Sequence, residues 1–125
     1  MNKKDTTPPA IIPYIGVDLD GTLAFYEKWH ADGGIGEPIE PMVNRVKDWL
    51  AQGLEVKIIS ARVAKFAPEG QIPEFDEDQL NRVYAWCEKH LGKKIPVQFW
   101  KDYAMHALFD DRARRVELNT GRIIG

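Results

Sequence analysis

The sequence predicts an α/β protein built on a mainly parallel sheet flanked by helices, and three observations support this prediction. Short apolar runs rich in β-branched residues alternate with two longer segments in which apolar residues recur at helical spacing. This alternation is typical of a parallel sheet, because a helix usually carries the chain back between parallel strands. Clusters of glycine and proline separate the segments. The length of 125 residues suits one domain, which we expect at residues 10–125 after a flexible N-terminal tail at residues 1–9.

Four apolar runs are predicted to form strands. They are short, as strands buried on both faces often are, and they lie at residues 10–17, 54–60, 95–100 and 106–109. The closing stretch, VELNTGRII, predicts a C-terminal β-hairpin that turns around Asn119-Thr120-Gly121.

Two segments are predicted to form helices. The first, PMVNRVKDWLAQG, has Pro41 in its first turn, a single apolar face and a stop signal at Gly53. The second spans about residues 76–91, with Asp76 as its capping residue and Gly92 at its end. Cys87 falls on the apolar stripe of this second helix, so we expect it to be a core residue.

Composition and charge narrow the class of protein. The chain is 44% hydrophobic and 29% charged, as in soluble globular proteins, and its net charge of −2 argues against strong binding to a nucleic-acid backbone. Cys87 is the only cysteine, which excludes an internal disulfide and favours a reducing, cytoplasmic location. The chain has neither an apolar run of about 20 residues nor a signal peptide, so we expect no membrane association.

Polar residues follow three of the predicted strands. Asp18 and Asp20 follow the first strand, Ser60 ends the second, and Asp110 and Asp111 follow the fourth. The carboxyl ends of parallel strands meet at one edge of a sheet, and ligands bind there in open α/β sheets. The sequence therefore predicts a site that combines four carboxylates and a hydroxyl.

Asp18 and Asp20 are spaced for two-step chemistry. Alternate residues of an extended chain point the same way, so both carboxylates can face one site, and Gly21 allows the sharp turn that follows. One carboxylate can then attack phosphorus while the other carries protons. The alternative is a strand that leaves the core through a polar turn, although a D-x-D-G-T stretch arises by chance in about one such chain in a thousand.

Asp110 and Asp111 are candidate metal ligands. Adjacent carboxylates repel each other, and Mg²⁺ prefers oxygen ligands of this kind. The alternative is a turn cap in front of the arginines that follow. Ser60 and Lys101 are candidates to hold a phosphate, through a hydroxyl and an ammonium group. Considered alone, Ser60 would be interpreted as a turn cap and Lys101 as a solvated side chain.

The order of these motifs resembles that of the haloacid dehalogenase (HAD)-like superfamily. Its phosphotransferases carry hhhhDxDGT, then hhhS/T, then a lysine, then an acidic pair after another strand. Here the corresponding residues read IGVDLDGT, VKIIS, Lys101 and ALFDD, over residues 14–111. The resemblance implies a Rossmann-like fold, and the short gaps after the first two motifs leave no room for a cap domain.

The resemblance also implies roles for the residues of the first motif. Asp18 would be the nucleophile that forms an aspartyl-phosphate, and Asp20 the general acid and base, with its backbone carbonyl as a ligand of Mg²⁺. Thr22, in the same motif, is a further candidate for phosphate binding.

The remaining motifs would hold the phosphoryl group and the metal. Ser60 and Lys101 would bind the transferring group, Asp110 would complete the metal site, and Asp111 would act through water or a hydrogen bond. Arg62, two residues after Ser60, either reaches a phosphate or faces solvent.

Two long irregular segments, residues 25–40 and 61–75, are expected to shape the site. In the resembling family the first forms a flap, where Trp29 either stacks on a base or sugar of the substrate or packs the flap onto the core. Trp29, Phe66 and Phe75 also offer an apolar surface through which the chain could form a homo-oligomer.

The function predicted from the sequence is a Mg²⁺-dependent phosphomonoester hydrolase that acts on a small phosphorylated metabolite or nucleotide. Two alternatives stay open. One is a phosphatase acting on nucleic-acid ends, since a capless site would admit a strand terminus. The other is a phosphate- or metal-binding protein without turnover, because a fold does not imply a function.

Overall fold

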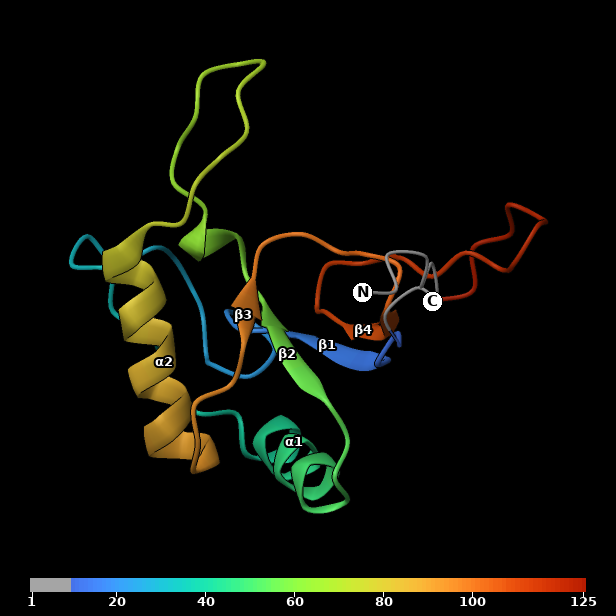
Figure 1. Cartoon of the computed structure of the whole chain (residues 1–125), viewed down its shortest axis with the longest axis horizontal. Helices are drawn as coiled ribbons and strands as arrows, with labels where there is room; N and C mark the ends of the chain where they lie inside the picture. Colours follow the sequence, from blue (N-terminus) through green and yellow to red (C-terminus); the bar gives the residue numbers. More distant parts are fainter. Residues whose placement is uncertain (1–9) are drawn as a thin grey trace, which may run out of the picture.

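A computed structural model describes residues 10–125, so the predicted tail at residues 1–9 lies outside the described part of the chain. The described residues form a four-stranded, all-parallel sheet with the strand order β3-β2-β1-β4 and two α-helices (Figure 1). The predicted α/β class with a parallel sheet is therefore confirmed. Along the chain the elements are β1 (Tyr14–Asp18), α1 (Glu40–Ala51), β2 (Val56–Ile59), the 3₁₀ turn η1 (Ala61–Val63), α2 (Glu77–Leu91), β3 (Val97–Gln98) and β4 (Met105–Phe109).

Both helices pack on the same face of the sheet. The chain steps from β1 through α1 to β2, and from β2 through α2 to β3, always in the same direction across the sheet. Because such crossovers are right-handed, helices inserted in two steps of the same direction lie on one face. The return from β3 to β4 contains no helix.

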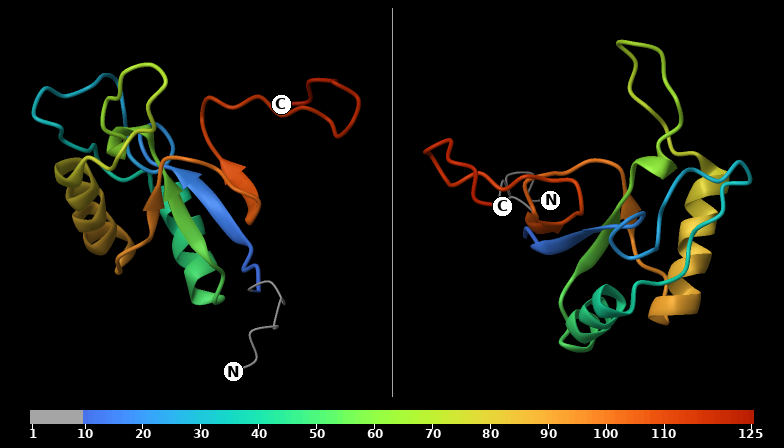
Figure 2. Two further views of the ribbon diagram at one scale, coloured as in Figure 1. Left: turned by 45° about the horizontal axis from the view of Figure 1, so that its top comes forward. Right: turned by 180° about the vertical axis from the view of Figure 1, so that it is seen from behind.

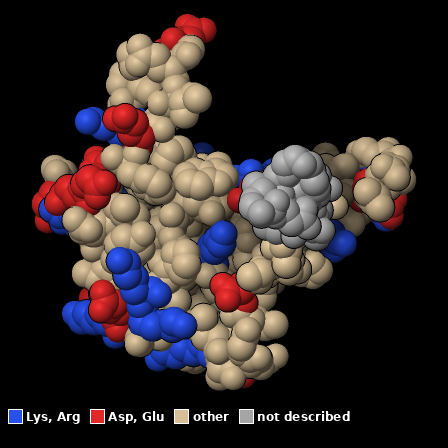
Figure 3. Space-filling view, in the orientation of Figure 1, with Lys and Arg blue, Asp and Glu red and all other residues tan. Residues whose placement is uncertain are grey.

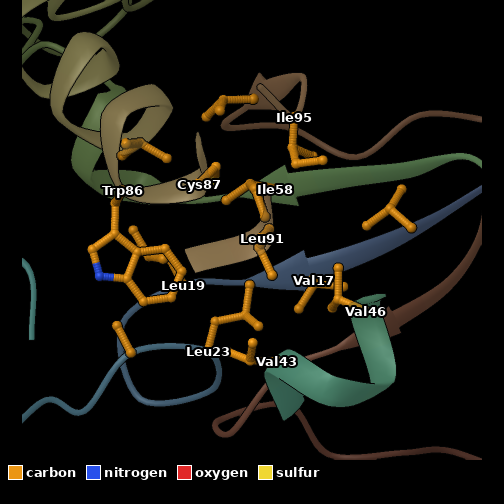
Figure 4. Close-up of a cluster of buried hydrophobic side chains, with 14 of the residues drawn as sticks. Val17, Leu19, Leu23, Val43, Val46, Ile58, Trp86, Cys87, Leu91 and Ile95 are labelled. Atoms are coloured by element: carbon orange, nitrogen blue, oxygen red, sulfur yellow. The ribbon is translucent and has the colours of Figure 1, made fainter. Parts of the chain in front are cut away.

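The core lies between this face and the two helices (Figure 4). Val17 in β1 pairs with Ile58 in β2, and both side chains are fully buried beneath the helices. The contribution of α2 includes Cys87, which is fully buried as predicted, and burial raises the pKa of its thiol to about 12. The other core residues from the helices are Val43, Val46, Val83, Trp86 and Leu91.

The ends of the helices follow local sequence signals. The side chain of Asp76 accepts a hydrogen bond from the backbone N–H of Gln79 at 3.1 Å, and α2 ends at Gly92 with φ +86°. This is the cap and the stop that the sequence predicts. Helix α1 has no side-chain cap and begins at Glu40, one residue before Pro41.

The strands are shorter than their apolar runs. Residues 10–13 are exposed, and Pro13 has no N–H to donate to a neighbouring strand, so β1 begins only at Tyr14. Pairing with β2 limits β3 to Val97–Gln98. Hydrophobicity predicted where the strands lie, but the paired neighbours set their ends.

The predicted C-terminal hairpin does not form a pair of strands. Its two arms meet at a single isolated antiparallel bridge between Val116 and Ile123. The segment 112–125 projects from the sheet (Figures 1 and 2), and Leu118 is 83% exposed. A two-stranded ribbon without a buried face is only marginally stable, which explains why the turn signal yields a bridge rather than strands.

The long segment after η1 also projects from the body, as Figure 2 shows, and is closed at its base by a bridge between Ala64 and Phe75. Between β1 and α1 the structure likewise has only isolated bridges. Figure 3 shows acidic side chains around the first turn of α2 and basic ones nearer its last turn, the distribution that a helix dipole favours. Within residues 10–125, no helix combines the length and apolar character needed to cross a membrane.

Candidate functional site

The residues predicted from the motifs lie at the carboxyl edge of the sheet, around a cavity of about 880 Å³. Segments that follow all four strands contribute to its lining. The lining includes all four predicted carboxylates, Asp18, Asp20, Asp110 and Asp111, together with Ser60. The expectation that polar residues after separate strands meet at one edge therefore holds for these five.

Three carboxylates form a compact group. Asp18, Asp110 and Asp111 each offer an oxygen within 4.8 Å of the others. The register of the sheet explains why: Val17 in β1 pairs with Phe109 in β4, so the residues that follow these two, Asp18 and Asp110, emerge side by side. An all-oxygen set of this kind suits Mg²⁺, which usually takes one or two carboxylates and completes its shell with water and phosphate oxygens. The three residues thus fit a divalent cation.

The first motif is fixed by its apolar residues. Leu19 and Leu23 are fully buried in the core, and the backbone N–H of Leu23 donates to the carbonyl of Leu19 at 2.9 Å. The polar residues between and beside them are thereby turned toward the sheet edge. At Gly21, with φ +92°, a Cβ atom would lie 2.7 Å from Oδ2 of Asp111, so no other residue fits here unstrained.

The hydroxyl of Thr22 links two of the carboxylates, those of Asp18 and Asp111. Its hydroxyl oxygen accepts a hydrogen bond from the backbone N–H of Asp111 at 3.1 Å. The same hydroxyl lies 3.1 Å from Oδ1 of Asp111 and 3.3 Å from Oδ2 of Asp18, and its single proton can be donated to either. Thr22 was predicted to bind phosphate; the structure places it among the carboxylates and not in the cavity lining.

The crowding of negative charge perturbs Asp18. Burial, a hydrogen bond with Asp111 and the charges of Asp110 and Asp111, in this order of importance, together raise the pKa of its carboxyl to about 7. In the absence of metal, a proton bound to Asp18 therefore relieves part of the repulsion between the three carboxylates. A divalent cation between these oxygens would favour the ionised form instead.

Asp20 stands apart from the three. Its carboxylate accepts two hydrogen bonds from Arg62, from Nε at 2.9 Å and from Nη2 at 2.8 Å. The side chains of Arg62 and Asp20 are only 3% and 19% exposed. The side chain of Asp20 is thus in a partly buried ion pair, and its predicted role in metal binding rests on the backbone carbonyl alone.

Arg62 uses all five of its N–H donors within the chain. Besides the two bonds to Asp20, it donates to the carbonyl of Gly33 at 2.8 Å, to the carbonyl of Gly34 at 3.3 Å and to Oε1 of Gln79 at 2.9 Å. Its guanidinium also lies 4.7 Å from the ring centre of Trp29. Arg62 therefore ties the first motif to segment 25–39 and to α2. Its side chain does not face solvent, and its contact with a phosphate stays a prediction.

Of the two residues predicted to bind the transferring phosphoryl group, Ser60 and Lys101, only Ser60 lines the cavity. Ser60 is buried, lines the cavity and accepts a hydrogen bond from the backbone N–H of Arg62 at 3.3 Å. Lys101 is exposed and is not part of the cavity lining. The basic residue that does line the cavity with Arg62 is Arg112, whose backbone N–H donates to Oδ1 of Asp110 at 2.7 Å.

Besides Ile59 and Ala61, which flank Ser60, three lining residues were not singled out as site residues from the sequence. They are Tyr26, Phe99 and Arg112. Two of them could have been found by the rule that residues after parallel strands meet at the carboxyl edge of the sheet. Phe99 directly follows β3, and Arg112 directly follows the acidic pair. Tyr26 lies in an irregular segment where the sequence offers no comparable signal.

Comparison of the chain with protein-family models, with curated proteins and with solved structures gave no match. The chain is an α/β protein with a parallel sheet and, at the carboxyl edge of that sheet, a candidate acidic metal site made by Asp18, Asp110 and Asp111.

Proposed function

We propose that the chain is a Mg²⁺-dependent phosphomonoester hydrolase of the HAD-like type without a cap domain, working through an aspartyl-phosphate. The observation that carries the proposal is the convergence of Asp18, Asp110 and Asp111 within 4.8 Å beside a cavity of about 880 Å³. Three carboxylates gathered at a ligand-binding edge of the sheet are costly without a cation, and their chemistry suits magnesium.

The two aspartates of the first motif have separate roles in this proposal. One oxygen of Asp18 attacks phosphorus, and the bond from phosphorus to the leaving oxygen breaks as a proton from Asp20 reaches that oxygen. Water then attacks phosphorus and gives its proton to Asp20, and the bond between phosphorus and Asp18 breaks to release inorganic phosphate. The ion pair with Arg62 holds the carboxylate of Asp20 outside the acidic group, so Asp20 would have to leave this pair to carry a proton.

Phosphoryl transfer depends mainly on positioning and on the neutralisation of negative charge. Mg²⁺ held by Asp18, Asp110 and Asp111 would supply most of that positive charge. We assign the hydroxyl of Ser60 as a donor to the phosphoryl oxygens, because Ser60 lines the cavity. Arg112 is the basic residue placed to assist, whereas Lys101 would have to move into the cavity to do so.

The test is the release of phosphate from a panel of monoesters that includes nucleotides, sugar phosphates and oligonucleotides with a terminal phosphate. Each reaction is run with Mg²⁺, with EDTA, and with Asp18→Asn. The matched control is Asp48→Asn, on the exposed side of α1, where the carboxylate only accepts a hydrogen bond from Gln52. Turnover that requires both Mg²⁺ and Asp18, and that survives in Asp48→Asn, is the expected result.

A second candidate is a protein that binds Mg²⁺ and phosphate without turnover. It is favoured by one observation: both oxygens of Asp20 accept hydrogen bonds from Arg62, so the proposed proton carrier is engaged elsewhere. Under this alternative, Mg²⁺ raises the affinity for inorganic phosphate, no member of the panel is hydrolysed, and Asp20→Asn leaves phosphate binding unchanged. Equilibrium dialysis with labelled phosphate separates the two functions.

A further inference from the structure

We propose that the cavity recognises a phosphate monoester that carries a nucleobase, and that Tyr26, Trp29 and Phe99 bind the base. This inference rests on the proposed function, because the acidic group locates the phosphate end of the ligand. The cavity lining combines two chemistries: the carboxylates and Ser60 on one hand, and these three aromatic side chains on the other. A nucleotide carries the matching pair, a phosphate and a flat apolar ring.

The strand order separates these two parts of the cavity. Asp18 ends β1 and Asp110 follows the neighbouring strand β4, whereas Phe99 follows β3, on the far side of β2. Strands lie about 4.8 Å apart, so the ends of β1 and β3 are separated by about 10 Å. A ligand that reaches both needs a spacer between phosphate and ring, and the sugar of a nucleotide is such a spacer.

Two of the three aromatic side chains, those of Trp29 and Phe99, are held in place before any ligand binds. Trp29 is 49% exposed, yet its ring lies 4.7 Å from the guanidinium of Arg62, which is itself fixed by five hydrogen bonds. Phe99 packs edge-on against Phe75 and Trp100, with ring centres 5.2 Å and 5.0 Å apart. Preorganised aromatic rings lose little entropy when a base stacks on them.

The size of the cavity agrees with this ligand class. Small-molecule sites commonly enclose about 300–1,000 Å³, and the cavity holds about 880 Å³. A free nucleotide and the phosphorylated terminus of an oligonucleotide present the same chemistry, a phosphate next to a base. The experiment therefore includes both sources.

The test compares kcat/KM for nucleoside 5′-monophosphates, for ribose 5-phosphate and for a short oligonucleotide with a terminal phosphate, all with Mg²⁺. We expect the better nucleotide source to exceed ribose 5-phosphate at least about fivefold, the low end for one stacked base. Trp29→Ala should remove most of this preference by raising KM, and Trp29→Phe should restore it. Phe66→Ala is the control, because Phe66 is 92% exposed in segment 64–75 and does not line the cavity.

Tyr26→Ala provides a second variant in case Trp29→Ala disturbs the packing around Arg62. Hydrolysis that depends on Mg²⁺ and Asp18, but proceeds equally well with ribose 5-phosphate and with both base-carrying substrates, overturns the inference and leaves the proposed function intact. If nothing is hydrolysed, equilibrium dialysis with a nucleoside monophosphate and Mg²⁺ decides. Binding that is lost in both Trp29→Ala and Tyr26→Ala supports base recognition without hydrolysis, and absence of binding overturns the inference.

Discussion

Replacing Asp18 by asparagine should stabilise the metal-free protein, although it removes the proposed nucleophile. Asp18 is partly buried beside Asp110 and Asp111, and burial together with these neighbours raises the pKa of its carboxyl from 3.8 to about 7. The folded protein therefore holds this proton more tightly than the unfolded chain does. Asparagine keeps the shape of the protonated carboxyl and adds no charge.

The raised pKa fixes the direction of the pH dependence. Stability from this group is fully present below about pH 4, declines as the unfolded chain loses its proton, and is exhausted once the pH passes about 7. A shift of roughly three pKa units corresponds to about 4 kcal/mol at most, at about 1.4 kcal/mol per unit. Because Asp18 also faces the cavity, solvent screening lowers our expectation to about 1–2 kcal/mol. For a chain of this size that is about 4–8 °C in Tm.

The assay is thermal unfolding in EDTA at pH 5 and at pH 8. We expect the Tm of Asp18→Asn to exceed that of the native sequence at pH 8, with a smaller difference at pH 5. With Mg²⁺ at ten times its Kd, the native sequence should gain about 1.4 kcal/mol and the variant should gain little. Asp48→Asn, on the exposed side of α1, should follow the native sequence under every condition.

Two results would refute this reasoning. If Asp18→Asn is no more stable than the native sequence at pH 8 in EDTA, the three carboxylates are not crowded as the structure indicates. If Mg²⁺ stabilises Asp18→Asn as strongly as the native sequence, Asp18 is not a ligand of the cation.

Three further changes test other parts of the structure. Arg62→Met leaves the partly buried carboxylate of Asp20 without its partner, so we expect a loss of about 1–3 kcal/mol in urea unfolding, larger than for Arg82→Met in an exposed pair. Thr22→Val deprives the backbone N–H of Asp111 of its acceptor, which should cost about 1–3 kcal/mol and weaken the Mg²⁺-dependent rise in Tm, while Thr22→Ser should retain both. Asp76→Ala removes the cap of α2 and should cost about 1 kcal/mol without changing Mg²⁺ binding measured by calorimetry.

The fold was largely predictable because its signals are local. The bounds of α2 follow from Asp76 and Gly92, whose effects depend on the neighbouring backbone only. The two arms of the C-terminal segment show the opposite case. The turn signal around Asn119 is present, yet strands also need a partner to bury one face, and Leu118 has none within residues 10–125.

The candidate site divides in the same way. The sequence by itself predicted that Asp18, Asp110 and Asp111 lie close together, since residues at the carboxyl ends of parallel strands emerge at one edge of the sheet. Only the tertiary structure decided that Asp20 pairs with Arg62, that Thr22 forms hydrogen bonds with the acidic group and that Lys101 stays outside the cavity lining.

The physical reason lies in the range of the interactions. Helix caps and turn glycines act over a few residues, and the alternation of strand and helix patterns indicates a parallel sheet without specifying any individual side-chain contact. The partners of Arg62 come from segments up to 42 positions away, and its five donors are satisfied only once β1, segment 25–39 and α2 have packed around it. Side-chain pairing across such distances is a property of the packed chain, and the sequence pattern does not encode it in any local form.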